Sequence, residues 1–414
     1  MTVEIVSVGT ELLMGQVANT DAQYIASRIA PLGCQVYYHS TVGDNPERLR
    51  RLTRTALDRA DVVIFTGGLG PTDDDLTKET VADALGLVCV PNEEATARLK
   101  DWFSSKGREM TPNNLKQAYF PKGSLIIPNH NVTAPGCIME NDGKAAILLP
   151  GPPRELEPMV DESVVPYLEK RCGFRLHSRE VRLIGLGESD AAWRIRDLIE
   201  EQTNPTVAPY IKPGEVTFRV TARCADDAEG EMLCKPVIRV MRERLGDVVF
   251  SDTGESLPAL VSRLLFERGE TLATAESLTG GMLADQIVSL PGSSRVFREG
   301  FVTYSDEAKI MRLGVSRDTI RRESAVSAAC AKEMAEGLLQ TTHADHALVT
   351  TGYAGPDGAD VGLVYIGYAG KHGTMVRELR LTGNRSRIRL TAALRALDLL
   401  RRRMTGIDYT DQGV

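Results

Sequence analysis

The sequence lacks features that several large classes of protein need. Its seven cysteines are an odd number and include no CxxC pair, which argues against both a disulfide framework and a zinc site. No apolar run approaches the roughly 20 residues that span a bilayer. We therefore expect buried thiols in a protein that has no membrane partner.

Basic character and targeting signals are also missing. The formal net charge is −7, so the composition gives no general electrostatic reason to bind nucleic acid. From Met1 the chain runs directly into a strand-like segment at 3–8, without the basic and apolar stretches of a secretory signal. We expect a cytoplasmic protein that does not bind nucleic acid.

The first part of the chain has an α/β pattern. With 414 residues the chain is too long for one ordinary domain. Strands are expected at 4–8, 34–42 and 61–65, and helices after Thr20, at 46–60 and at 77–85. Strands that are apolar on both faces predict a parallel sheet covered by helices.

The pattern changes near residue 171. The expected elements are a strand at 179–184, a helix at 189–202, a strand at 214–222 and a helix at 229–245. A unit of this size predicts a small α+β sandwich that links two larger domains. From about residue 253 the α/β alternation resumes, with a helix at 256–268 and a strand at 271–275, and residues 406–414 form a tail.

Three loops of the first part follow strands, at 9–15, 66–75 and 149–154. In an open parallel sheet, ligands bind beyond the carboxyl ends of the strands, so the three loops predict one cleft. A glycine-rich turn before a helix also offers backbone N–H groups to phosphate. The predicted substrate-binding residues here are Gly67, Gly68, Gly70 and Thr72.

Carboxylates stand beside that turn. Asp73, Asp74 and Asp75 follow it directly, and Glu11 lies in the first loop. They would repel a phosphate unless a divalent metal ion lay between them. Alternatively, an aspartate cluster at the start of a helix only caps the helix and favours its dipole.

The sharpest motif is the segment at 275–281, AESLTGG, where an expected strand runs into a helix. The junction would expose Ser277 beyond the sheet edge, near N–H groups that could stabilise an oxyanion. The six histidines form no Ser-His-Asp motif, so Lys309 is the candidate base, with Tyr304 at a second junction. Alternatively, Ser277 is only a helix cap and Lys309 a solvated helix residue.

Several motifs resemble one known family. SVGTELL, TGGLGPTDDD and LLPGPP resemble the molybdopterin-binding-like fold at the N-terminus of the CinA family, and residues 204–219 are similar to its KH-like domain. AESLTGG, VTYSDEAK and TGYAGP followed by VG match its C-terminal domain. The resemblance implies a three-layer α/β/α domain at 1–170, a KH-like α+β domain at 171–252 and a C-terminal α/β deamidase domain at 253–405.

The resemblance implies two activities. The C-terminal domain would be a nicotinamide mononucleotide deamidase without a cofactor, with Ser277, Tyr304 and Lys309 at its catalytic positions. Its implied substrate-binding residues are Thr279, Gly280, Thr351, Gly352 and Arg385. The N-terminal domain would hydrolyse the pyrophosphate of ADP-ribose with a divalent metal such as Mg²⁺, Co²⁺ or Ni²⁺, and with K⁺ as a further ion. The implied metal ligands are Asp73, Asp74, Asp75 and Glu11.

Three further expectations follow from the resemblance. The chain would form a homodimer. The family usually has glycine before TAPG, and this chain has Val132 there, which changes the loop that faces the ligand. The alternative function is a catalytically weak binding protein linked to competence or recombination, which the family name implies.

Overall fold

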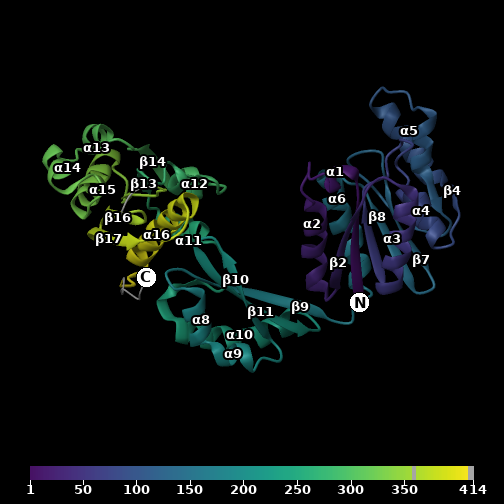
Figure 1. Cartoon of the computed structure of the whole chain (residues 1–414), viewed down its shortest axis with the longest axis horizontal. Helices are drawn as coiled ribbons and strands as arrows, with labels where there is room; N and C mark the ends of the chain where they lie inside the picture. Colours follow the sequence, from purple (N-terminus) through teal and green to yellow (C-terminus); the bar gives the residue numbers. More distant parts are fainter. Residues whose placement is uncertain (357–359, 409–414) are drawn as a thin grey trace. The chain divides into compact units, whose positions relative to one another are not determined.

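The computed structural model describes residues 1–356 and 360–408 (Figure 1). The chain divides into two compact units, one comprising Met1–His177 with Arg223–Gly230 and the other comprising Ser178–Ala222 with Glu231–Val414. Residues 409–414 of the expected tail lie outside the described residues.

The first unit is built on a six-stranded sheet in the order β2-β1-β3-β8-β7-β6. Its strands are β1 (Thr2–Val8), β2 (Gln35–Val42), β3 (Val62–Thr66), β6 (Leu125–Ile127), β7 (Gly136–Asn141) and β8 (Lys144–Leu149). The first four in that order are parallel, as predicted, whereas β7 is antiparallel to both β8 and β6. The sequence analysis missed the hairpin of β7 and β8, although its turn, Asp142-Gly143 with positive φ at both residues, is a strong hairpin signal.

Helices cover both faces of this sheet, as the α/β pattern predicts. They are α2 (Thr20–Ile29), α6 (Pro153–Met159) and α7 (Val165–Glu169) on one face, and α3 (Pro46–Arg59), α4 (Thr77–Ala84) and α5 (Glu93–Ser105) on the other. Strand β1 alternates between the two cores, with Val3 and Ile5 in one and Val6 and Val8 in the other. The result is a three-layer α/β/α arrangement.

Short elements complete the first unit. They are α1 (Thr10–Leu13), η1 (Ala30–Leu32), β4 (Cys89–Pro91), η2 (Pro112–Ala118), β5 (Tyr119–Pro121) and the π-helical turn η3 (Val160–Val164). Both α1 and η2 lie beside the loops that follow the parallel strands, and both contribute residues to the cleft described below.

The KH-like segment contains a four-stranded sheet in the order β10-β11-β9-β12. Its elements are β9 (Arg175–Leu183), α8 (Glu188–Arg194), α9 (Arg196–Glu200), β10 (Thr206–Lys212), β11 (Glu215–Cys224), α10 (Asp227–Leu245), η4 (Gly246–Val248) and β12 (Val249–Ser251). The sequence analysis missed β10 and β12. β10 is an edge strand that contains Pro209, and proline inside a strand pattern weakens the prediction. β12 is only three residues long.

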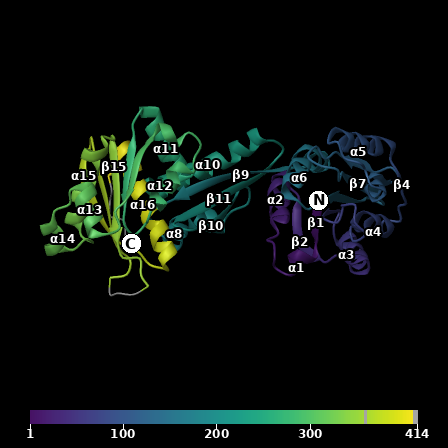
Figure 2. The same ribbon diagram turned by 90° about the horizontal axis from the view of Figure 1, so that it is seen from above.

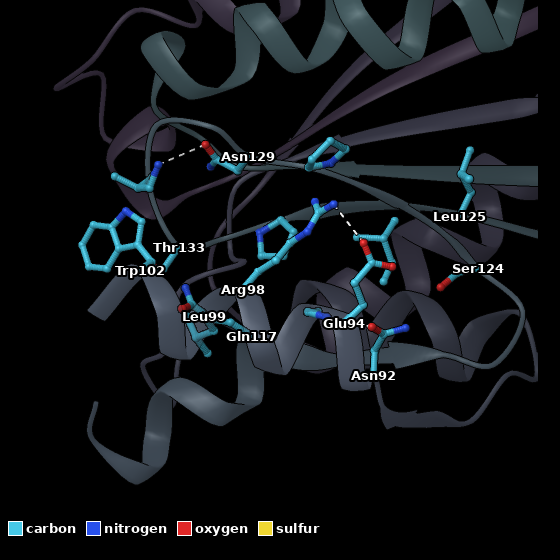
Figure 3. Close-up of a pocket in the computed structure, with 15 residues that line it drawn as sticks. Asn92, Glu94, Arg98, Leu99, Trp102, Gln117, Ser124, Leu125, Asn129 and Thr133 are labelled. Atoms are coloured by element: carbon cyan, nitrogen blue, oxygen red, sulfur yellow. Dashed lines mark hydrogen bonds and ion pairs between the residues drawn. The ribbon is translucent and has the colours of Figure 1, made fainter. Parts of the chain in front are cut away.

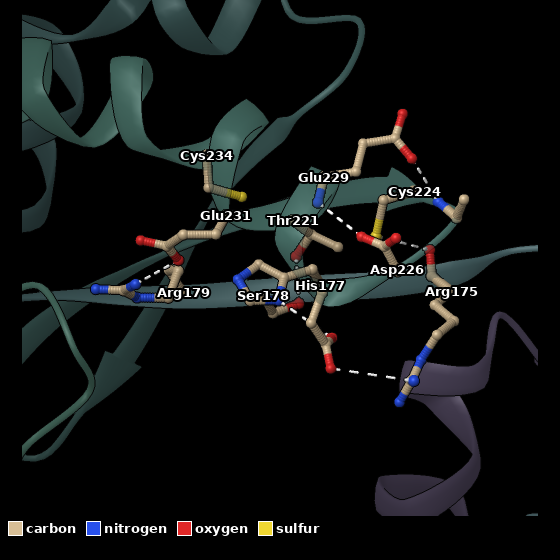
Figure 4. Close-up of polar contacts among 12 residues, drawn as sticks. Arg175, His177, Ser178, Arg179, Thr221, Cys224, Asp226, Glu229, Glu231 and Cys234 are labelled. Atoms are coloured by element: carbon tan, nitrogen blue, oxygen red, sulfur yellow. Dashed lines mark hydrogen bonds and ion pairs between the residues drawn. The ribbon is translucent and has the colours of Figure 1, made fainter.

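The turn between β11 and α10 groups with the first unit because it contacts the start of β9 (Figure 4). The thiol of Cys224 donates to the Arg175 carbonyl oxygen at 3.6 Å. Gly230 lies so close to His177 that a Cβ added there would be 2.2 Å from the Cβ of that histidine. Only glycine allows this approach.

The C-terminal region has a five-stranded sheet in the order β14-β13-β15-β16-β17. The strands are β13 (Leu272–Glu276), β14 (Phe297–Val302), β15 (His346–Gly352), β16 (Leu363–Gly370) and β17 (Gly373–Arg380). β13 lies between β14 and β15 and is parallel to both, whereas β16 is antiparallel to β15 and to β17. β13 therefore ends beside two other strand ends, where the sequence analysis places Ser277.

Helices cover both faces of this sheet as well (Figure 2). They are α11 (Leu257–Arg268), α12 (Met282–Val288) and α16 (Arg385–Thr405) on one face, and α13 (Asp306–Leu313), α14 (Arg317–Glu323) and α15 (Ala328–Thr342) on the other, with the short turn η5 (Ser293–Arg295) before β14. Each face has its own apolar core. The predicted helix at 256–268 and strand at 271–275 differ from α11 and β13 by one residue at most at each end.

Helix α16 also ties the KH-like segment to the C-terminal sheet within the second unit. The buried carboxylate of Asp398 accepts from Nε of Arg401 at 2.8 Å and from Nε of Arg402 at 2.9 Å. Both arginines also donate to the Asp247 carbonyl oxygen. Since each buried charge has a partner, the contact avoids the large cost of an unpaired ion in the core.

Candidate active sites

Ser277 lies in the tight turn between β13 and α12. Its N–H donates to the Thr350 carbonyl oxygen of β15 at 2.9 Å, so the serine continues the sheet by one residue. The chain then reverses at Gly280 and Gly281, which both have positive φ. These backbone conformations favour glycine, and they place Ser277 at the end of the strand, as the sequence predicts.

The side chain of Glu276 holds this turn in place. It is 1% exposed, and its carboxylate accepts from the N–H groups of Gly281 at 3.0 Å, Leu283 at 2.9 Å and Ala284 at 2.8 Å. The sequence analysis missed this role and assigned N–H groups at the helix start to an oxyanion. These three groups are already bonded, so an oxyanion would need other donors.

Lys309, on α13, is the side chain that meets Ser277. Its Nζ lies 3.4 Å from the Ser277 Oγ and donates to the Thr303 carbonyl oxygen at 3.1 Å. The residue is 2% exposed, so the alternative of a solvated helix lysine is wrong. Burial lowers the pKa of Lys309, because the charged amine loses its hydration.

Cys330, on α15, is a second buried polar group near Lys309. The sequence analysis predicted a buried thiol but not this neighbour. Burial raises the pKa of Cys330 to about 11, so near neutral pH it is a neutral thiol. It therefore gives Lys309 no negative charge that would keep the amine protonated.

Tyr304 and Arg385 meet at a more exposed position. Tyr304 is 62% exposed, and its hydroxyl oxygen accepts from Nη2 of Arg385 at 3.4 Å. Nη1 of the same arginine donates to the Gly355 carbonyl oxygen at 2.7 Å. The two predicted residues are thus brought together, with surface left free on the tyrosine for a ligand.

Other predicted substrate-binding residues are held by internal contacts. The buried hydroxyl of Thr351 donates to the Ala325 carbonyl oxygen at 2.8 Å, and the hydroxyl of Thr279 pairs with that of Thr350 at 2.7 Å. A Cβ at Gly352 would be 2.6 Å from the Leu363 carbonyl oxygen. Both threonine hydroxyls are therefore engaged within the protein, and position 352 leaves no room for a side chain.

Arg389, on α16, was missed by the sequence analysis. Its Nε donates to the Leu278 carbonyl oxygen at 2.9 Å and its Nη2 to that of Thr279 at 2.7 Å. It therefore binds carbonyl oxygens of the turn after Ser277, whereas Glu276 binds N–H groups. An arginine in the first turns of a long helix carries no sequence signal for such a contact.

The N-terminal loops form one cleft, as predicted. The cavity has a volume of about 660 Å³ and is lined by residues of the loops after β1, β3 and β8. The predicted residues in its wall are Gly67, Gly68, Gly70, Glu11, Asp74 and Asp75. Thr72 and Asp73 are not among the lining residues. A Cβ at Gly67 would be 2.2 Å from the Val8 carbonyl oxygen, which explains the glycine.

Carboxylates dominate the charge of this cleft. Asp21 also lines it, and burial, with the nearby Glu157 carboxylate, raises the pKa of Asp21 to about 6. Asp75 accepts from the backbone N–H and the hydroxyl of Thr72. Within residues 1–356 and 360–408, no three His, Cys, Asp or Glu side chains are grouped to hold a metal ion.

The oxygen donors of the cleft nevertheless suit a hard divalent cation. Mg²⁺ is commonly held by one or two carboxylates together with water and the phosphates of a substrate. Glu11, Asp74 and Asp75 line the same cavity as the glycine-rich turn. A metal ion that arrives with a phosphate therefore fits these residues without a complete protein cage.

Val132 also lines the cleft. Its φ is not positive, so the backbone at this position does not require glycine. The N–H of Val132 donates to Oδ1 of Asn129 at 3.2 Å, and Nδ2 of Asn129 donates to the Ala134 carbonyl oxygen at 3.0 Å. Any effect of valine in place of the glycine that the resemblance implies therefore comes from the added side chain.

Comparison with known families divides the chain into three matched segments. Residues 254–404 match the CinA C-terminal domain, residues 4–170 match a family described as a probable molybdopterin binding domain, and residues 178–251 match the KH domain of the damage-inducible protein CinA.

Relatives match over nearly the whole chain. A competence-damage inducible protein of Acetivibrio thermocellus is 48% identical over 406 residues, which are 97% of this chain and 98% of that protein. A CinA-like protein of Dictyoglomus turgidum is 46% identical over 406 residues, 97% of this chain and 99% of that protein. A crystal structure of a CinA superfamily protein from Klebsiella pneumoniae is 35% identical, covers 36% of this chain and 96% of its own, and has a TM-score of 0.35.

The helices of the described residues include none with the length and apolar character of a membrane-spanning segment.

The contacts of Glu276 predict a local loss of protection when its carboxylate is removed. In Glu276→Ala, the amides of Gly281, Leu283 and Ala284 lose their charged acceptor, and we expect their hydrogen exchange to accelerate at least about a hundredfold. Exchange measured by mass spectrometry over 281–288 tests this. Glu276→Gln should give an intermediate rate and the exposed Glu299→Ala no change, whereas unchanged protection in Glu276→Ala would contradict the assignment.

Proposed function

Since the chain belongs to the CinA family, we propose that its C-terminal domain is a nicotinamide-nucleotide amidase. It would convert nicotinamide mononucleotide and water to nicotinate mononucleotide and ammonia. The observation that carries the proposal is the 3.4 Å contact between the Ser277 hydroxyl and the buried amine of Lys309. A serine needs a nearby base, and a desolvated lysine supplies one.

The neutral form of Lys309 fits the contacts around it. A neutral amine has two N–H donors and one lone pair. The carbonyl oxygens of Thr303 and Tyr304 lie 3.1 Å and 3.5 Å from Nζ and can accept both donors. The lone pair is then left to accept the proton of the Ser277 hydroxyl, which is the arrangement that general base catalysis requires.

The proposed reaction has two stages. As the Ser277 Oγ attacks the carboxamide carbon, its proton passes to Lys309 Nζ, which then protonates the leaving amine as the C–N bond breaks and ammonia departs. Water next attacks the ester, gives one proton to Lys309, and the Ser277 oxygen takes a proton back as nicotinate mononucleotide leaves. The N–H groups of Leu278 and Thr279, which follow Ser277 in the turn, are our candidates for the oxyanion donors.

Arg385 and Tyr304 are placed to bind the rest of the nucleotide. A guanidinium group binds a phosphate bidentately, and Arg385 is already oriented by the Gly355 carbonyl oxygen. We assign it to the 5′-phosphate. Tyr304, which contacts Arg385, would help to move protons at the edge of the site.

We propose a second activity for the N-terminal cleft, the metal-dependent hydrolysis of the ADP-ribose pyrophosphate bond. The glycine-rich turn offers N–H groups to phosphate, and the carboxylates of Glu11, Asp74 and Asp75 line the same cavity. When bound, the metal ion would neutralise the charge of the phosphates and lower the pKa of a bound water. Both activities would serve pyridine nucleotide recycling in the cytoplasm, with a homodimer as the expected assembly.

The alternative is a binding protein linked to competence, which the names of the relatives suggest. A KH domain clamps a nucleic-acid backbone with a GXXG loop, and this chain has Gly185-Leu-Gly187 instead. The position of a Cβ at Gly185 is 2.4 Å from the guanidinium of Arg395, so this loop packs against α16. The amidase proposal is therefore the better supported one.

The first prediction from the proposed activities concerns the nucleophile. Ser277→Ala should lower the rate of ammonia release from nicotinamide mononucleotide at least about a thousandfold, because no oxygen is left to form the ester. Chromatography of nicotinate mononucleotide measures the rate. Ser305→Ala, which removes a helix-cap hydroxyl on α13, is a matched control that should keep most of the activity. Full turnover in Ser277→Ala would exclude the mechanism.

The second prediction concerns pH. Protonated Lys309 cannot accept the Ser277 proton, so kcat/KM should fall as the pH drops through the Lys309 pKa. Because burial lowers that pKa from 10.5, the midpoint of the limb should lie below this value. Lys309→Arg, whose guanidinium stays charged, should be nearly inactive without such a limb. A limb that persists unchanged in Lys309→Arg would assign the titration to another group.

The third prediction uses two neighbouring aspartates with different positions. Asp74 lines the cleft and Asp73 does not. Asp74→Asn should therefore reduce metal-dependent AMP release from ADP-ribose by about tenfold or more, whereas Asp73→Asn should have little effect. Titration of Mg²⁺ against AMP release distinguishes weaker metal binding from slower turnover. Equal effects of both changes would contradict the position assigned to Asp74.

A further inference from the structure

A second cavity of about 400 Å³ lies beside the N-terminal cleft (Figure 3). One wall is α5, where Glu94, Arg98 and Trp102 follow one another at four-residue spacing and so share one helix face. The other wall is formed by residues between Ser124 and Pro135. The volume is in the range of small-ligand pockets, and nothing in the two proposed reactions accounts for it so far.

The cavity adjoins the cleft. Gln117, Val132 and Thr133 line both. A ligand with a phosphate group at the glycine-rich turn could therefore place another part of its structure against α5. A two-part ligand such as a dinucleotide has the form that these adjoining spaces would accept.

Gln117, in this shared wall, has a buried side-chain oxygen without a hydrogen-bond partner among the described residues. It is 3% exposed, and among the described residues its Oε1 has no hydrogen bond. By contrast, the Asn129 amide is fully used and Oδ1 of Asn92 caps α5 by accepting from Ala95. Native proteins keep few unpaired buried acceptors. The terminal torsion of glutamine is roughly twofold, so the oxygen can turn to a donor in the cavity.

We propose that this cavity, bounded by α5 and Gln117, binds the adenine ring of the dinucleotide whose pyrophosphate lies at the glycine-rich turn. This rests on the proposed pyrophosphatase function and extends it to base recognition. The exocyclic amine of adenine donates to Oε1 of Gln117. The indole of Trp102 offers an aromatic face and Arg98 a planar cation, both of which stack on nucleobases. The ion pair between Arg98 and Glu94, at 2.9 Å, orients the guanidinium.

Tryptophan fluorescence tests the pocket without catalysis. The chain has two tryptophans, and Trp193 lies on α8, outside the first unit. In full-length Trp193→Phe protein, Trp102 is the single reporter. Adenosine, which has no phosphate, should quench its emission saturably without metal. Emission that does not respond to adenosine would overturn the proposal.

Variants of Gln117 test recognition of the amine. Gln117→Leu should weaken adenosine binding by about tenfold, whereas Gln117→Glu keeps an acceptor and should retain it. Inosine has a carbonyl in place of the amine, so Gln117→Glu should reject it by about tenfold or more relative to adenosine. Circular dichroism of both variants checks folding. If Gln117→Leu binds adenosine as the parent does and Gln117→Glu does not distinguish the two nucleosides, the assignment is wrong.

The same proteins separate this inference from the proposed activity. AMP release from ADP-ribose is measured in parallel with adenosine binding. Adenosine binding without ADP-ribose cleavage would keep the base pocket and remove the pyrophosphatase proposal. Cleavage without a Trp102 response would keep the pyrophosphatase and remove the base pocket.

Discussion

The removal of the Lys309 amine from water is the constraint on which the C-terminal site depends. The amine of Lys309 lies where β13 and β14 end, beside α15. Its neighbours are two carbonyl oxygens, the Ser277 hydroxyl and the thiol of Cys330. The Asp306 carboxylate raises the pKa of Lys309 by less than burial lowers it. A lysine with a tightly paired carboxylate would stay protonated. Here the effect of burial outweighs these opposing charges and lowers the pKa of the amine, as a general base requires.

The N-terminal cleft has the opposite charge character, because carboxylates line it. Its charged side chains are carboxylates, and burial together with the nearby Glu157 carboxylate raises the pKa of one of them, Asp21. A cation would neutralise part of this negative charge. Lysines stand behind the cleft rather than inside it. Lys116 donates to the carbonyl oxygens of Thr72 and Asp75, and Lys78 donates to those of Lys116 and Gln117. These contacts connect the glycine-rich turn of the cleft to η2, which carries Gln117 of the adjoining cavity.

Sequence patterns predicted the local structure well and the long-range contacts poorly. The strand-to-helix junction at Ser277 is local, since alternation and glycines encode it. The role of Glu276 could not be predicted in this way. A glutamate at the end of a strand has no distinct sequence pattern, and its contacts exist only once the start of α12 is folded against it. Arg389 acts on residues more than a hundred positions away. The domain boundaries at 170/171 and 252/253 stay predictions. The chemical roles of the site residues also stay predictions, because contacts alone do not measure a reaction.

Val132 occupies a position where the resemblance to the family implies glycine. Its backbone needs no glycine, and its loop is fixed by Asn129, so the side chain has a defined place and costs no strain. That place is the wall shared by the cleft and the cavity against α5. An apolar side chain there offers a surface to an apolar ring face. A dinucleotide that spans both spaces, as proposed, passes Val132, and the valine would then supply an apolar contact that a glycine lacks.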